Sequence, residues 1–505
     1  MHNKKLIRTI AIVLAILLVG GVVFSALVSA LAEAQMASET GGKNVHDISM
    51  EYLPDEQALH ITQRLLYMNT AGVRLNEVVF YAAGNMFRRE SALMYEQGDL
   101  ESVFFAGYAP AGIDLQSVLC DGEKADYGFQ GEQELYLRVA CRLDPGETCL
   151  FEFDYYLLLM VCGAFQGVGN TDVRLSAFCF APGHYNAGSG SFDMKSPVPF
   201  TDWMFCDPAD YRVDLVIPEN CEVCASGIAT GTGRSGGRRA WHMEARDVRE
   251  FALAFGRRWR VFEGESADGI PVRVFCNVRG AGREALKAAI DALDQCREWF
   301  GPYPGAVLNI VQSDYPLGMM VFPGMGWFSE ESFSAKNREV LAHRIRFCVA
   351  KQYFGVAAAA DPVADAWLSD SVCEYVACLL LESQKGKDAF LAFVNRDWVS
   401  ALQQTVPGGL RIISDAGLFD AYSYDIVVRK RGAVVFHELR LAMGLEALLS
   451  GLKGFYEMGK DGHILEEMDL VHCMDRASGK SWEAFLTDWV FNVGEYAQQN
   501  MTWYE

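Results

Sequence analysis

The chain has 505 residues, of which 51% are hydrophobic, and its formal net charge at pH 7 is −21. This length exceeds what one hydrophobic core supports, so we expect two or three folded domains. The negative charge argues against nucleic-acid binding, which needs clustered basic side chains to neutralise phosphate.

The first predicted element is an apolar helix near the N-terminus. A short basic segment precedes 24 residues, Thr9 to Ala32, that carry no charge. As a helix this stretch reaches about 36 Å, enough to cross a hydrocarbon layer of about 30 Å. The basic flank favours a cytoplasmic N-terminus, so we expect residues 1–35 to be a cytoplasmic stub and single-pass transmembrane anchor in the cell membrane, with the C-terminal remainder extracytoplasmic. The alternative is a cleaved signal peptide, because Ala30-Leu31-Ala32 fits a small-x-small cleavage pattern.

From about Val45 to Phe262 the sequence shows mostly period-two alternation broken by turn residues. Residues 58–67 and 211–217 are examples. Such alternation predicts half-buried antiparallel strands in packed sheets. The segment Gly231 to Gly236 matches G-x-G-x-x-G, but a further predicted strand follows it instead of a helix. We therefore interpret it as a hairpin tip and not as a phosphate-binding loop.

The fourteen cysteines are scattered along the chain, many of them in apolar runs. An exported protein permits disulfides, but this distribution favours buried thiols that act as small hydrophobic side chains. Cys221-Glu222-Val223-Cys224 is a C-x-x-C motif without a second pair or nearby histidines to complete a metal site. A redox or metal role for it is the less favoured interpretation.

The hydrophobic period becomes helical from about residue 281. A predicted helix ends at Gly301-Pro302, a strand follows at 306–312, and helices continue to the C-terminus. Residues 263–505 therefore form a second, mainly α-helical unit. The expected fold class is α+β multidomain, with an N-terminal transmembrane helix.

Six short motifs follow one another in this second half. They are Trp299–Pro304, Gly318–Gly324, Ala350–Gly355, Trp367–Ser371, Arg429–Ala433 and Trp482–Trp489.

In this order the motifs resemble F-G-x-Y-P, G-A-M-E-N, the end of H-E-x-x-H-Q-W-F-G, W-L-N-E-G, Y-x-K-G-A and F-x-x-W of the M1 aminopeptidases. Lys351 and Asp370 are 19 positions apart, the family spacing between its second histidine and its third metal ligand. The resemblance to these gluzincin metallopeptidases implies that residues 36–262 form a β-rich N-terminal saddle domain. It implies that residues 263–505 form a thermolysin-like peptidase domain.

The resemblance also locates a catalytic centre whose residues are replaced. Catalytic zinc needs two imidazoles one helical turn apart, a carboxylate, and a glutamate that takes a proton from the metal-bound water. These positions hold Phe347 and Lys351 for the imidazoles, Cys348 for the glutamate and Asp370 for the third ligand. Asp370 is the one plausible metal ligand that remains, and the lysine ammonium disfavours a divalent cation beside it. We expect no catalytic residues at these positions and no cofactor.

Two further catalytic positions of the family differ. The glutamate that binds the substrate amino group is replaced by Val321, and the tyrosine that stabilises the oxyanion is replaced by Arg429. Tyr422 and Tyr424 lie just upstream, and either one approaches the cleft if the register is shifted.

Other candidate ligands were weighed against this interpretation. His343, Cys348 and Asp370 form a conceivable shifted metal site, but residues five apart do not share a helical face well, which argues against it. His437-Glu438 starts like H-E-x-x-H, yet leucine stands at the last position. We interpret that pair as exposed residues of an ordinary helix.

The replaced positions suggest an ion pair in place of the metal. Lys351 and Asp370 occupy positions that converge on one ion, so we predict that the ammonium and the carboxylate bind each other.

The sequence thus predicts an M1-like protein that binds a peptide or an envelope protein as a catalytically inactive pseudopeptidase. The alternatives are an active metallopeptidase that holds zinc at a non-standard site, and a purely structural role.

Overall fold

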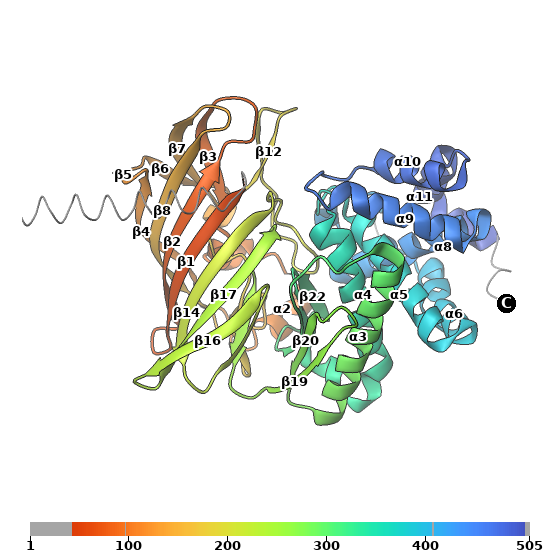
Figure 1. The fold of residues 1–505 in the computed structure, drawn as a ribbon, viewed down its shortest axis with the longest axis horizontal. Coiled ribbons are helices and arrows are strands. Elements are labelled where there is room, and N and C mark those ends of the chain that lie inside the picture. Colours follow the sequence, from red (N-terminus) through yellow and green to blue (C-terminus); the bar gives the residue numbers. More distant parts are fainter. Residues whose placement is uncertain (1–42, 96, 407–408, 500–505) are drawn as a thin grey trace, which may run out of the picture.

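A computed structural model describes residues 43–95, 97–406 and 409–499 of the chain. A β-rich half is followed by a mainly helical half, and the two lie side by side (Figure 1). The predicted order of a β-rich and a helical unit is confirmed. The expected anchor at 9–32 lies outside the described residues. Among the helices that are described, none is both long and apolar enough to cross a membrane.

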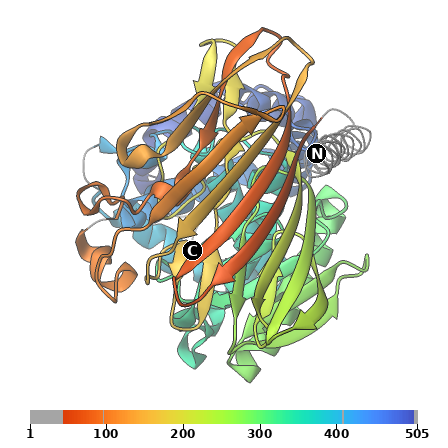
Figure 2. The ribbon, with the colours of Figure 1, turned by 90° about the vertical axis from the view of Figure 1, so that its left-hand side faces the viewer.

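An eight-stranded sheet forms the outer wall of the β-rich half, and Figure 2 shows its broad face. Alternate side chains of each strand point inward, as in β2, where Leu59, Ile61 and Leu65 are fully buried. The strands, in sheet order, are β16 (Ile228–Ser235), β17 (Arg238–Val248), β14 (Ala209–Pro218), β1 (Asn44–Leu53), β2 (Ala58–Met68), β8 (Thr148–Leu158), β4 (Gly112–Cys120) and β5 (Glu123–Lys124).

Two four-stranded sheets pack on the inner face of this wall. Phe80 of one sheet meets Phe151 and Phe153 of β8 edge to face, with ring centroids 5.2 and 5.3 Å apart. Tyr52 of β1 meets Phe255 of the other sheet at 5.1 Å. The first sheet consists of β11 (Ala181–Pro182), β3 (Leu75–Tyr81), β7 (Tyr136–Leu143) and β6 (Tyr127–Gln130). The second sheet consists of β15 (Glu222–Ala225), β18 (Leu253–Gly256), β10 (Asp172–Leu175) and β9 (Gln166–Val168). This half also contains the hairpin of β12 (His184–Asn186) and β13 (Ser191–Asp193) and the helix α2 (Gln97–Val103).

The helical half begins with a five-stranded sheet whose edge strand is β22. That strand pairs antiparallel with β23 and ends the sheet order. The strands are β19 (Arg260–Glu265), β20 (Pro271–Cys276), β21 (Leu308–Ser313), β23 (Met325–Ser329) and β22 (Met319–Phe322). The helices are α3 (Arg279–Phe300), α4 (Arg338–Lys351), α5 (Ala366–Lys385), α6 (Lys387–Gln403), α7 (Ala421–Tyr424), α8 (Gly432–Met443), α9 (Leu445–Gly459), α10 (Glu467–Ser478) and α11 (Glu483–Gln499), with π-helical segments η6 (Gln352–Ala357) and η9 (Asp425–Arg431).

Helix α5 lies at the centre of the helical half. From Ala366 to Leu381 it is buried on nearly all sides, as expected of a helix that is apolar around most of its circumference. It contacts α4, α6 and α8, and its neighbour α4 leads directly into the π-helical segment η6. Side chains that lie between α4 and α5 are therefore held in fixed positions by the packing of the two helices.

The glycine-rich segment 231–236 forms a hairpin and no phosphate-binding loop. It lies at the end of β16, and the chain turns at Gly236 and Gly237, whose φ angles are +59° and +76°. Such left-handed backbone favours glycine, because a Cβ atom would be strained there. The interpretation as a hairpin is confirmed.

The cysteines are mostly buried thiols, as expected. All fourteen lie in the described residues, and within these none forms a disulfide; Cys120 and Cys141 are partly buried and the others are fully buried. In the C-x-x-C motif, the Cys224 thiol donates to the carbonyl of Ala254 at 3.3 Å.

The prediction that His437 is exposed is wrong. The side chain lies on α8 among the rings of Tyr375, Phe390 and Trp398, and the residue is only 5% exposed. Burial lowers the pKa of His437 to about 4, so the imidazole is neutral at pH 7. Glu438 is partly buried, and burial raises its pKa to about 7.

Candidate functional site

The face of α4 that points toward α5 carries Phe347 and Lys351 one turn apart. Residues four apart lie above one another on a helix, which is the geometry that two metal-binding imidazoles require. Lys351 is the last residue of α4, where the partial negative charge of the helix end stabilises a cation. Both side chains are buried, with exposed fractions of 1% and 4%.

The Lys351 ammonium binds two carboxylates. The Lys351 Nζ forms an ion pair with Oδ1 of Asp370, which lies near the start of α5. It forms a second ion pair with Oδ2 of Asp202 at 2.9 Å. The predicted pair of Lys351 and Asp370 is confirmed. Asp202 comes from the long connection between β13 and β14, so the ion pair also joins the two halves of the molecule.

Arg429 and Tyr424 complete the surroundings of Asp370. The Arg429 Nε donates to Asp370 Oδ2 at 3.1 Å, and the Tyr424 hydroxyl donates to the same oxygen at 3.0 Å. The guanidinium also lies 5.0 Å from the centre of the Phe347 ring, where the face of the ring attracts a cation. We call Lys351, Asp370, Asp202, Arg429 and Tyr424 the Lys351 cluster.

The Lys351 cluster is electrostatically balanced, with two cations facing two carboxylates. Burial alone would raise the pKa of Asp370, but Lys351 and Arg429 outweigh it and hold this pKa at about 2. Burial opposes the charge of Lys351, yet Asp202 and Asp370 raise the pKa of its ammonium well above the usual value. Both members of the pair are therefore charged at neutral pH.

The two remaining predicted positions, Cys348 and Val321, form no ion pair or hydrogen bond with Lys351 or Asp370 among the described residues. The Cys348 thiol packs against β23, where a Cβ atom at Gly326 would come within 2.7 Å of its Sγ. Burial raises the pKa of this thiol to about 12, so it stays protonated. Val321 is buried on β22 and is 4% exposed.

These residues do not fit a catalytic zinc ion. The ammonium of Lys351 binds the carboxylate of Asp370, and Phe347 has no lone pair to offer. In the described part of the chain, two groups of three side chains bring possible ligand atoms within 4.8 Å of one another, and neither group includes Asp370 or Cys348. The groups of possible metal ligands among the described residues thus do not include the combination of His343, Cys348 and Asp370.

The space beside the Lys351 cluster is small. A cavity of about 20 Å³ borders Lys351 and Asp370, and one of about 40 Å³ is lined by Val321, Asp202 and Glu250. Since a single water needs at least about 10–15 Å³, these cavities hold a few waters and no amino-acid residue. Burial, followed by the nearby charge of Asp202, raises the pKa of Glu250 to about 8.

A larger pocket lies one helical turn away along α4 and α5. Its volume is about 240 Å³, and its lining includes Gly318 and Met319 at the start of β22, Arg344 and His343 on α4, and Arg429. Arg344 donates to the Ser332 hydroxyl at 2.6 Å, and among the described residues it forms no ion pair. We call this space the Arg344 pocket.

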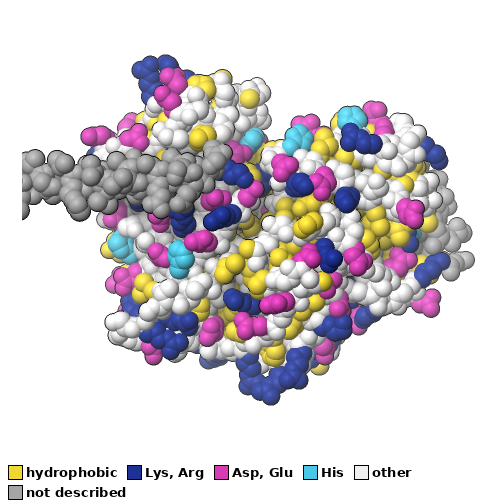
Figure 3. All heavy atoms as spheres, viewed as in Figure 1, with side chains coloured by type: hydrophobic (Ala, Val, Ile, Leu, Met, Phe, Trp, Pro, Cys, Tyr) yellow, Lys and Arg dark blue, Asp and Glu magenta, His cyan; other side chains and the backbone are white. Residues whose placement is uncertain are grey.

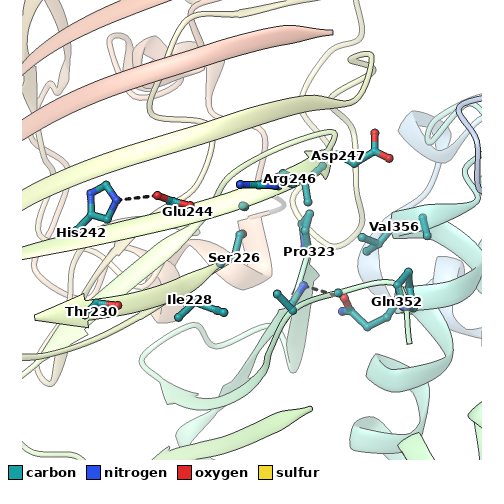
Figure 4. Close-up of a pocket in the computed structure, with 18 residues that line it drawn as sticks. Ser226, Ile228, Thr230, His242, Glu244, Arg246, Asp247, Pro323, Gln352 and Val356 are labelled. Carbon is teal, nitrogen blue, oxygen red and sulfur yellow. Dashed lines mark hydrogen bonds and ion pairs between the residues drawn. The ribbon is translucent and has the colours of Figure 1, made fainter. Parts of the chain in front are cut away.

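A further pocket lies elsewhere, between the β16–β17 hairpin and the helical half. It measures about 640 Å³, and Figure 4 shows its lining residues. His242 is paired there with Glu244 at 3.0 Å, and Gln352 accepts from the Gly324 amide at 2.8 Å. These polar groups bind one another instead of converging on the space, so this pocket offers no catalytic arrangement.

Comparisons with known proteins show which proteins this chain resembles in sequence and in fold. Aminopeptidase M1-B of Oryza sativa subsp. japonica is 26% identical over 259 residues, which is 46% of this chain and 28% of that protein. Aminopeptidase N of Lactococcus lactis subsp. lactis is 26% identical over 266 residues, covering 48% of this chain and 31% of that protein. The chain is an M1 aminopeptidase-like protein.

Solved structures agree with the fold of this M1 aminopeptidase-like protein. The M1 zinc metallopeptidase of Deinococcus radiodurans has a TM-score of 0.63 and 18% identity, covering 89% of this chain and 94% of that one. A mutant of it bound to a Tyr-Ser-Ala substrate gives the same TM-score and identity, covering 89% and 95%. No family model matches the chain. The chain spans less than a third of the length of the two curated relatives above.

Sequence reasoning missed Asp202 as a partner of Lys351. It lies in a connection without a hydrophobic period, and no sequence signal brings it to α4. Tyr424 was considered, and the structure brings it to Asp370, whereas Tyr422 is 66% exposed and binds Gln404 at 2.5 Å.

Proposed function

We propose that this M1 aminopeptidase-like protein binds peptide segments in its cleft without hydrolysing them. The observation that carries the proposal is the Lys351 ammonium, which is bound to Asp370 where the family positions converge on a metal. A cation in that place repels zinc, and the protonated thiol of Cys348 supplies no general base.

The edge position of β22 supports peptide binding, because extended peptides commonly pair with edge strands. Its four residues are 2–8% exposed, so a peptide would reach it through the spaces at its two ends. Its two ends border two different spaces: Met319 lines the Arg344 pocket, and Val321 lines the small cavity near Asp202. The Tyr-Ser-Ala substrate bound to the Deinococcus mutant supports the same class of ligand for this chain.

Arg344 gives this cleft a preference for an anionic group. Its guanidinium lies against the start of β22, where a Cβ atom at Gly318 would come within 2.9 Å of Nη2. Burial lowers the pKa of Arg344 most, Asp425, which also lines the pocket, raises it, and Arg429 lowers it. A carboxylate from a peptide C-terminus or an acidic side chain would supply the ion pair that Arg344 does not form among the described residues.

We also propose that the protein is held at the cell membrane with its folded part extracytoplasmic. The support is the uncharged stretch Thr9 to Ala32 with its basic flank. The bound peptide would then belong to an envelope protein or to an extracytoplasmic peptide.

A fluorescently labelled acidic peptide and its C-terminally amidated, neutral counterpart test the binding proposal. We expect the acidic peptide to bind more tightly and to be recovered intact by mass spectrometry. Arg344→Gln should weaken binding of the acidic peptide about 10- to 100-fold. This fold-change corresponds to the free energy that a hydrogen bond to a charged group usually contributes. The control Arg338→Gln removes a guanidinium that binds Glu284 outside the pocket.

Equal binding by Arg344→Gln and Arg338→Gln would contradict the assigned role of Arg344. Absence of binding by either peptide would favour the purely structural alternative. Cleavage that chelators abolish would favour an active metallopeptidase with a non-standard metal site.

A further inference from the structure

A set of side chains of metal-ligating types lies between α4 and α5, one helical turn from the Lys351 cluster. His343 precedes Phe347 by one turn on α4, and Glu374 follows Asp370 by one turn on α5. Cys378 lies one further turn along α5. The three possible ligand atoms, an imidazole nitrogen, a carboxylate oxygen and a thiol sulfur, all lie within 4.8 Å of one another.

We propose that His343, Glu374 and Cys378 bind a divalent transition-metal ion of the zinc type. Its open coordination position would face the Arg344 pocket, since His343 and Glu374 both line that space.

The donor set matches the chemistry of such an ion. Zinc takes imidazole nitrogen, thiolate sulfur and carboxylate oxygen, and three protein ligands leave one position open. The His343 Nε2 already lies 3.0 Å from Glu374 Oε2. Ligands about 2.0–2.3 Å from a tetrahedral ion are separated by about 3.3–3.8 Å, so small movements of these side chains complete the site.

Neighbouring residues fix two of the three ligands. The Trp398 Nε1 donates to Glu374 Oε1 at 3.5 Å, and the Phe393 ring lies 4.4 Å from the His343 ring. Within the described residues, the Nδ1 of His343 is buried without a hydrogen-bond partner, and the Nε2 is the ring nitrogen that faces Glu374.

The simpler alternative is an ion pair of His343 and Glu374 beside a buried thiol that only fills space. A second alternative is metal binding at Cys120, Asp121 and Cys149 on the β-rich half, the other described group with ligand atoms within 4.8 Å. Cysteine variants distinguish the proposed site from both alternatives, because only the proposed site requires a single thiolate ligand from Cys378.

The probe is Co²⁺, titrated into the full chain after metal removal under reducing conditions. We expect one equivalent to bind, with a thiolate-to-cobalt charge-transfer band of single-sulfur intensity, and Zn²⁺ to displace it. Cys378→Ala should abolish the band and weaken Co²⁺ binding at least about tenfold, because even ligand-orienting residues contribute 10- to 100-fold. Cys149→Ala and Cys348→Ala should bind Co²⁺ as the unaltered protein does.

Glu374→Gln provides a second variant that leaves every thiol in place. It should retain the fold by circular dichroism and weaken Co²⁺ binding to a similar extent. Loss of the band in Cys149→Ala, or no binding by the unaltered chain, would overturn the proposal. None of these readouts depends on peptide binding or hydrolysis, so a failure here leaves the proposed function untouched.

Discussion

At the residue scale, Lys351 is the centre of a buried network of ion pairs. Its ammonium forms ion pairs with Asp370 and Asp202, and Arg429 forms an ion pair with the second carboxylate oxygen of Asp370. Buried ion pairs of this kind add little stability compared with apolar residues of similar size. Removal of one partner is nevertheless destabilising, because it leaves the other charge buried and uncompensated.

Lys351→Met is expected to lower the free energy of unfolding by about 3–5 kcal/mol, because Asp370 and Asp202 lose their shared cation. Urea denaturation at pH 7 measures the change. The control Lys287→Met removes an ammonium that is 75% exposed and pairs with Asp291 on the surface of α3, so we expect a change within about 0.5 kcal/mol. Similar unfolding midpoints for the two variants would show that the Lys351 cluster does not support the fold.

Glu250 gives the stability a pH dependence of known sign. Its folded pKa of about 8 lies above its ordinary value of 4.5, so the folded state holds a proton that the unfolded state releases. Stability from this residue is fully present below about pH 4.5 and declines as the pH rises toward about 8.

Glu250→Gln is therefore expected to be more stable than the unaltered protein at neutral pH. The difference should grow from pH 5 to pH 8 and exceed about 1 kcal/mol, since each unit of pKa difference corresponds to about 1.4 kcal/mol. Denaturation curves at pH 5, 6, 7 and 8 measure it. A constant difference across this range would show that Glu250 titrates normally.

At the scale of elements, the helix pair α4–α5 and the segment η9 set the positions of the Lys351 cluster. In a π-helical turn, residues five apart come onto one face. This explains why Tyr424 and Arg429, which are five apart, both reach Asp370. An ordinary helical period could not predict that arrangement.

Gly432 is required for the close approach of α8 to α5. A Cβ atom there would lie 2.0 Å from the Ser371 Oγ and 2.5 Å from its Cβ. Gly432→Ala should therefore destabilise the protein by about 1–3 kcal/mol, the usual cost of overpacking. Thermal unfolding is the measurement.

Gly454→Ala on α9 is the matched control. The nearest atom to its added Cβ is the Cys473 Sγ at 3.6 Å, an ordinary contact. We expect no loss of stability, and a gain of up to about 1 kcal/mol from helix propensity. Equal melting temperatures for the two glycine variants would rule out close packing at Gly432.

The sequence could predict those parts of the site that depend on local periodicity. Phe347 and Lys351 follow from the helical period, and Asp370 follows from a family spacing. Asp202 could not be predicted, because it is brought to Lys351 by tertiary contact between the two halves. The burial of His437 was missed for a similar reason, since three aromatic residues from two other helices surround it.

At the scale of the whole molecule, segment 199–202 joins the β-rich half to the helical half. The Pro199 carbonyl accepts from Tyr315, the Phe200 carbonyl accepts from Arg429, and Asp202 binds Lys351. The Lys351 cluster therefore lies at the interface of the two halves. Acidic and basic side chains are interspersed on the face seen in Figure 3, so the net charge of −21 is not gathered in one patch there.

We propose that this M1-like cleft does not hydrolyse peptides through zinc at the family's metal position. The most direct measurement is hydrolysis of an aminoacyl p-nitroanilide and of a tripeptide by the full chain, with and without added Zn²⁺. We predict rates equal to the protein-free blank in both conditions, for the unaltered chain and for Asp370→Asn alike. Zinc-dependent release of product that chelators stop and Asp370→Asn abolishes would contradict the account.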